Sequence, residues 1–112
     1  MPEQLTSSNP TSNTLYYNPP AAPSAVILEL RVRNHPGTMS HITGLFARRA
    51  FNLDAILCVP NPDRSTSRVL LLVPADPRLQ QLERQLARLY DVLEIRHRAD
   101  LSPDIFGRFA TT

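Results

Sequence analysis

The clearest pattern along the chain is an alternation of apolar and polar residues in Ala25–Arg33. A period of two residues is typical of a strand that buries one face. Asn34-His35-Pro36-Gly37 follows and predicts a turn, since X-Pro-Gly ends regular structure. The positions of this strand that should face the core are Val26, Leu28, Leu30 and Val32.

Two later segments have apolar residues at helical spacing. The first is Thr38–Arg49, and the second begins at Asp76-Pro77 and continues to Tyr90. Aspartate before proline favours a helix start, because aspartate caps the helix and proline fits its first position. The two apolar stripes consist of Met39, Ile42, Leu45 and Phe46 in the first helix, and Leu79, Leu82, Leu86 and Leu89 in the second.

Three further strands are predicted, over Phe51–Pro60, Ser67–Val73 and Val92–Arg98. The order is then strand, helix, strand, strand, helix, strand. Two such halves sharing one sheet indicate an α+β, ferredoxin-like βαββαβ fold, with a four-stranded antiparallel sheet and two helices on one face.

The sheet face away from the helices should also be apolar. We expect it to carry Ile27, Ile56, Cys58, Leu70 and Leu72. A patch of this kind is rarely left in water and predicts a partner that covers it.

Proline usage divides the chain. Five of the eleven prolines lie in the first 23 residues, among Ser, Thr and Asn. We therefore expect a disordered tail over residues 1–24, a folded domain over 25–99 and a C-terminal tail over 100–112. Ser102-Pro103-Asp104 could start a short docking helix in that last tail, or the tail could fray. The small domain alone is marginally stable, which favours a partner or a second copy.

Charge and composition exclude several functions. All twelve basic residues are arginine, and the net charge is only +2. The predicted strands lack the aromatic residues on which RNA-recognition domains of this strand order stack bases, so we predict no nucleic-acid partner. No apolar run is long enough to span a bilayer, and the N-terminus lacks the pattern of a signal peptide. We expect a cytoplasmic protein without a membrane partner.

Catalytic chemistry is sparse in the sequence. Three glycines cannot build a phosphate-binding loop, and Cys58 is the only cysteine. The three histidines, His35, His41 and His97, fall on different elements without the spacing of metal ligands. We predict no catalytic residue, no metal site and no cofactor in this chain.

The turn between the first strand and the first helix is the best candidate for binding. The first N–H groups of a helix lack internal partners and attract a carboxylate. Gly37 would allow a ligand to approach the backbone, and the Asn34 amide could address both ends of a zwitterion. An ordinary turn could look the same, so both interpretations stay open on these residues alone.

The motifs N-H-P-G-x-M and G-L-F-A-R-R-A-F-N, within Val26–Pro60, resemble the small regulatory subunits of acetohydroxyacid synthase (acetolactate synthase), in particular the short isozyme I type. Those subunits are built on an ACT domain, whose fold is the one predicted above. The resemblance implies a non-catalytic chain that binds and activates a large catalytic subunit. It also implies feedback inhibition by valine in branched-chain amino acid biosynthesis. Thiamine diphosphate, FAD and magnesium would be carried by the catalytic partner.

The resemblance also implies site residues and assembly. The effector would bind between the ACT domains of a homodimer, at Asn34, Gly37, Thr38 and Met39 of one chain and Asn52 of the other. The interface with the catalytic subunit is predicted at Arg48, Arg49, Ile27, Leu70 and Leu72. The alternative is a stand-alone ACT-domain sensor of amino acids that acts on a different enzyme.

Overall fold

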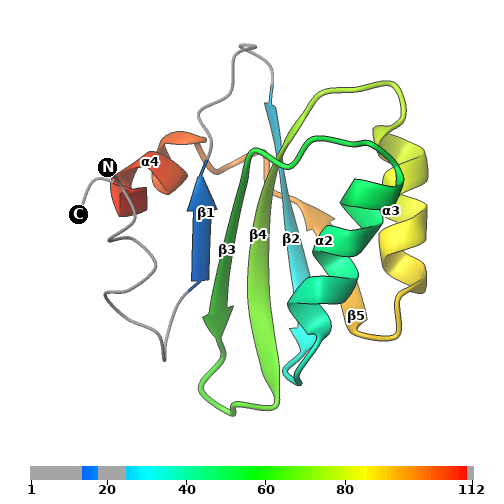
Figure 1. Cartoon of the computed structure of the whole chain (residues 1–112). Coiled ribbons are helices and arrows are strands. Elements are labelled where there is room, and N and C mark those ends of the chain that lie inside the picture. The colour runs from blue at the N-terminus through cyan, green and yellow to red at the C-terminus, as the bar shows by residue number, and fades with distance from the viewer. Residues whose placement is uncertain (1–13, 18–24, 111–112) are drawn as a thin grey trace.

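The structure is a computed structural model that describes residues 14–17 and 25–110. Its strands are β1 (Thr14–Tyr17), β2 (Ala25–Arg33), β3 (Ala55–Pro60), β4 (Thr66–Pro74) and β5 (Val92–His97). Its helices are α2 (Thr38–Arg48), α3 (Leu79–Arg88) and α4 (Asp104–Ala110). The five strands form one antiparallel sheet in the order β1-β3-β4-β2-β5 (Figure 1).

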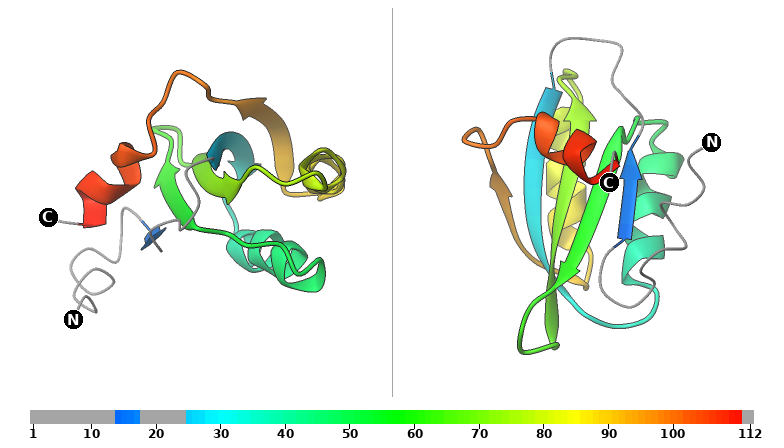
Figure 2. Two further views of the ribbon diagram at one scale, coloured as in Figure 1. Left: turned by 90° about the horizontal axis from the view of Figure 1, so that it is seen from above. Right: turned by 90° about the vertical axis from the view of Figure 1, so that its left-hand side faces the viewer.

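The predicted βαββαβ unit is confirmed. It runs from β2 to β5, with α2 and α3 on one face of the sheet (Figure 2). The central pair is β2 and β4, which register Leu28 opposite Leu71 and Leu30 opposite Val69. Opposed residues share a face, so these four side chains point together toward the helices.

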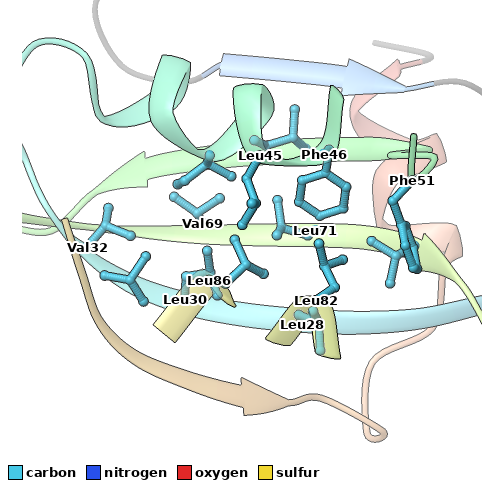
Figure 3. Packing of buried hydrophobic residues seen from close by; sticks show 14 of the residues in the cluster. Leu28, Leu30, Val32, Leu45, Phe46, Phe51, Val69, Leu71, Leu82 and Leu86 are labelled. Carbon is cyan, nitrogen blue, oxygen red and sulfur yellow. The ribbon is translucent and has the colours of Figure 1, made fainter. Parts of the chain in front are cut away.

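The main core lies between the sheet and the two helices. Figure 3 shows Leu45 and Phe46 of α2 and Leu82 and Leu86 of α3 gathered in one cluster with side chains of β2 and β4. Phe46 meets Phe51 edge to face, with ring centroids 5.9 Å apart. These contacts bury the apolar stripe that the spacing predicted on each helix.

The opposite face of the sheet is covered by the chain itself. Helix α4 lies there, away from α2 and α3 (Figure 2), and its Phe106 is fully buried. A second apolar cluster forms beneath it, consisting of Ile27, Ala55, Leu57, Leu70, Leu72 and Phe106. Of the two alternatives for the C-terminal segment, the structure shows the helix.

Two predictions need correction. Residues 14–17 were expected in a disordered tail, but they form β1, which pairs with β3 from Thr14 opposite Cys58 to Tyr17 opposite Ala55. The remainder of residues 1–24 lies outside the described residues. The predicted faces of β3 were also reversed, because Ile56 pairs with Leu71 and Cys58 with Val69, which places both on the helix side.

Candidate functional site: the loop between β2 and α2

The loop that joins β2 to α2 is held to two neighbouring segments. The side-chain Nδ2 of Asn34 donates to the carbonyl of Arg64 at 2.9 Å, and the backbone N–H of Asn34 donates to the carbonyl of Ser65 at 3.0 Å. Both acceptors lie in the turn between β3 and β4. On the other side, the Arg33 N–H donates to the carbonyl of Asp91 at 2.8 Å. The loop therefore has a fixed position where it leaves the sheet.

Gly37 lies at the N-terminus of α2 with a left-handed backbone, at φ 93°. A residue with a Cβ is strained in this region, which explains glycine here. Thr38 follows with its side chain buried, and its hydroxyl donates to the Arg33 carbonyl at 2.9 Å. The Thr38 N–H donates to the carbonyl of His35 at 3.3 Å, a long bond that a ligand at this position would have to replace. The Met39 side chain is half-buried against the main core.

A buried carboxylate fixes the other side of the loop. Asp91, just before β5, is 1% exposed. One carboxylate oxygen pairs with Nε2 of His35 in the loop, and the other pairs with Nδ1 of His41 in α2. Nδ1 of His35 lies 2.8 Å from the carbonyl oxygen of Pro36. One side chain therefore ties the β5 end of the sheet to both the loop and the helix that follows it.

The electrostatics of this His35–Asp91–His41 cluster follow from these contacts. Hydrogen bonds from His41, and then from His35, hold the pKa of Asp91 below its usual range, although burial acts in the opposite direction. The Pro36 carbonyl, and then Asp91, raise the pKa of His35 above 6.5. Arg33 acts against that rise. Its guanidinium stacks over Tyr90, 4.4 Å from the ring centroid.

Sequence reasoning missed this cluster. The sequence pattern places His35 and His41 on different elements without the spacing of metal ligands, and it does not single out Asp91. The three side chains meet only because β5 pairs with β2, and Asp91 is 56 residues from His35. No local spacing could reveal that contact. Among the described residues, no group of three or more His, Cys, Asp or Glu side chains is arranged to hold a metal ion.

Asn52 does not join the loop within one chain. It is exposed in the connection that follows α2, whereas the loop precedes α2. The eleven residues of the helix separate the two by about 16 Å. Nearby Asp54 is 8% exposed, and burial raises the pKa of its carboxyl group. A site that uses both Asn34 and Asn52 must therefore take them from two chains.

The predicted contacts with a catalytic subunit divide into two groups. Ile27, Leu70 and Leu72 are 4%, 5% and 0% exposed beneath α4, so they cannot meet another chain in this arrangement. The expectation that a partner covers this face was wrong, because residues of the C-terminal segment of the same chain cover it. Arg48 and Arg49 are exposed at the end of α2.

Arg48 and Arg49 border a pocket of about 270 Å³ between α2 and α3. Arg78 lines the same pocket, with its guanidinium 5.1 Å from the centroid of the Phe51 ring. Arg78 pairs with Asp76 at 3.1 Å, whereas Arg48 makes no ion pair or hydrogen bond within the part of the chain that the structure describes. Three guanidinium groups line this pocket, and only that of Arg78 pairs with a carboxylate, so the region carries positive charge.

Comparison with known proteins decides the family. A sequence model described as the AHAS small subunit-like ACT domain matches residues 28–94, more than half of the chain. The chain belongs to this family of acetohydroxyacid synthase small subunit-like ACT domains. The resemblance that the loop and helix motifs indicated is therefore confirmed, and so is the ACT-type fold.

Individual members of the family agree. The acetolactate synthase isozyme 1 small subunit of Escherichia coli K12 is 51% identical over 85 residues, which cover 76% of this chain and 88% of that one. The acetolactate synthase small subunit of Haemophilus influenzae is 36% identical over 62% of this chain, but only 43% of its own length is covered.

A solved structure gives the same result. The small subunit of acetolactate synthase from Thermotoga maritima matches with a TM-score of 0.59 and 30% identity. The match covers 65% of this chain and 46% of that one. The ACT domain of a GTP pyrophosphokinase from Chlorobium tepidum, at 16% identity and a TM-score of 0.52, shares the fold.

None of the described helices is long and apolar enough to cross a membrane.

The Asp91 cluster predicts a pH dependence of stability. Because the pKa of His35 is raised, its stabilising effect is complete below pH 6.5 and is lost as the pH rises through the raised value. Because the pKa of Asp91 is lowered, its effect is present above pH 3.8 and is lost as the pH falls through the lowered value. Asp91→Asn should therefore flatten the decline in the free energy of unfolding between about pH 5.5 and pH 8.5.

Urea unfolding across that range measures the effect. Asp104→Asn, at an exposed carboxylate at the start of α4, is the matched control and should keep the wild-type slope. An Asp91→Asn profile parallel to that of the wild type would show that the cluster does not control the stability of the loop.

Proposed function

We propose that this chain is the regulatory subunit of an acetolactate synthase, which binds the large catalytic subunit, activates it and makes it sensitive to inhibition by valine. The observation that carries the proposal is the 51% identity to the E. coli isozyme 1 small subunit over 88% of its length. The thiamine diphosphate, FAD and magnesium of the reaction belong to the catalytic subunit in this proposal. This chain then supplies the effector site and the contact surface, and it acts in the cytoplasm.

The effector site is proposed at the start of α2. The carboxylate of valine binds the backbone at Gly37, Thr38 and Met39, where the positive end of the helix dipole favours an anion. Gly37 supports this placement, because it has no side chain beside the His41 ring, where the ligand would lie. The Asn34 amide nitrogen is held by Arg64, so its oxygen is the atom left to face the ligand.

A second copy of the chain completes the site by bringing Asn52 to this loop. The β1 edge of the sheet lies on the side of α2, and the β5 edge lies beside α3 (Figure 2). In the proposed homodimer, the two α2 helices lie side by side, and β1 is the strand nearest the partner. Tyr16 of β1 is 50% exposed, so its ring is available at this edge for contact with the second copy.

Valine acts in this proposal by favouring one arrangement of the dimer over another. A ligand shifts such an equilibrium only by its difference in affinity for the two states. A coupling of about 1–3 kcal/mol is ordinary for allosteric proteins. The contacts of Asp91 support this role. They connect the loop to the residue before β5, so a shift of the loop on binding would be transmitted to the sheet.

The effector site is tested with Gly37→Asp in the reconstituted holoenzyme. The new carboxylate would occupy the place of the effector carboxylate and repel it, and the left-handed backbone adds about 1–2 kcal/mol of strain. Acetolactate formation should still be activated by the variant, but half-inhibition should need at least about tenfold more valine.

Gly44→Ala is the matched control. Its new methyl group would lie 3.4 Å from the end of the flexible Arg48 side chain, and alanine stabilises a helix interior by about 1 kcal/mol relative to glycine. It should keep normal inhibition. If Gly37→Asp is inhibited as strongly as Gly44→Ala, the loop is not the effector site. If the wild-type chain leaves the catalytic subunit unchanged, the regulatory role is wrong.

Arg48 and Arg49 are proposed to contact an acidic surface of the catalytic subunit. Arg48→Glu should raise the concentration of chain needed for half-maximal activation by about fivefold or more at low salt, with a smaller effect at high salt. Because Arg48 has no ion pair within the described residues, the substitution should leave the fold intact.

Arg88→Glu, at the exposed end of α3, adds the same charge on another surface and should have little effect. Equal affinities of the two variants for the catalytic subunit would remove Arg48 from the interface.

A further inference from the structure

The hydrogen bonds of the His35–Asp91–His41 cluster determine which ring nitrogens carry protons. Nδ1 of His35 faces the carbonyl oxygen of Pro36, and its Nε2 faces a carboxylate oxygen of Asp91. Both neighbours are acceptors, so both nitrogens of His35 must donate, and the ring is an imidazolium. This positive charge compensates the buried carboxylate of Asp91.

His41 has a different arrangement. Its Nδ1 faces the second carboxylate oxygen of Asp91, so Nδ1 carries a proton. With the proton on Nδ1, the other ring nitrogen of His41, Nε2, is the acceptor of this tautomer.

Nε2 of His41 lies close to Gly37, at the start of α2. Nε2 lies 3.9 Å from the point that a Cβ on Gly37 would occupy, and Cε1 lies 3.8 Å from it. The His41 side chain is 57% exposed, and the hydrogen bond to Asp91 fixes its orientation. No described residue makes a hydrogen bond to this Nε2. An oriented acceptor thus lies beside Gly37 at the start of the helix.

We propose that Nε2 of His41 accepts a hydrogen bond from the ammonium group of the effector, while the effector carboxylate binds the backbone at the start of α2. The inference rests on the proposed effector site and adds the residue that selects α-amino acids. Asp91 is a positioning residue here, since it acts through His41 by fixing its tautomer and orientation. A carboxylate ligand without an amino group gains nothing from this acceptor.

The experiment compares valine with 3-methylbutanoate, which has the same carbon skeleton without the ammonium group. Both are titrated into the reconstituted holoenzyme while acetolactate formation is measured. The informative variant is His41→Asn, because the asparagine side-chain nitrogen can keep the bond to Asp91 while the acceptor at the position of Nε2 is lost. His97→Asn is the control, since His97 pairs with Glu83 on another surface, at 2.8 Å.

Wild type and His97→Asn should be inhibited by valine and not by 3-methylbutanoate. His41→Asn should activate the catalytic subunit normally but need about tenfold more valine for half-inhibition. Equal inhibition of wild type and His41→Asn by valine would overturn the role of His41 and leave the loop site standing. Equal inhibition of the wild type by valine and 3-methylbutanoate would also overturn the role of His41, because the ammonium group would then contribute nothing to binding. No inhibition of the wild type by valine would instead contradict the proposed function.

Discussion

The structure depends on one buried carboxylate at the junction of three elements. Asp91 lies before β5, and its two oxygens meet a histidine from the β2–α2 loop and a histidine from the second turn of α2. A buried carboxylate without partners would be strongly destabilising, whereas one with two donors orients whatever donates to it. The direction of the His41 ring follows from this arrangement, and the loop is held by it together with the Asn34 and Thr38 hydrogen bonds.

The two faces of the sheet have different roles. The helix side contains the main core and displays the loop and the arginine-lined pocket. The other side is closed by α4, which buries Phe106 against Leu72 and its neighbours. Apolar residues on a sheet face therefore did not mark a surface for another protein, because the same chain covers them. Arg48 and Arg49 at the end of α2 are exposed, and the proposed contact with a catalytic subunit therefore uses them.

Much of the fold could be predicted from local pattern. Alternation gave the bounds of Ala25–Arg33, and the stripe that includes Leu82 and Leu86 placed the second helix on the core. The face of β3 was predicted wrongly. Nearly every residue of that strand is apolar, so the sequence has no polar–apolar alternation that would show which side chains face the helices. Pairing of Ile56 with Leu71 settles the question, and pairing is a property of the sheet as a whole.

The candidate site was only partly predictable for the same reason. The loop and Gly37 have a local signature, and the family motif coincides with it. Asp91 has none, because its role arises from a contact across 50 and 56 residues. Strand β1 was also missed, since four residues in a proline-rich segment show no strand pattern until the edge of β3 is available to pair with them.

The most direct test of this account is a measurement of the protonation of the histidine ring nitrogens by ¹⁵N nuclear magnetic resonance at neutral pH. We expect both nitrogens of His35 to carry protons, and the proton of the His41 tautomer to lie on Nδ1, which faces Asp91. If both rings are neutral and carry the proton on Nε2, as exposed histidines commonly do, Asp91 does not hold the loop and the account is contradicted.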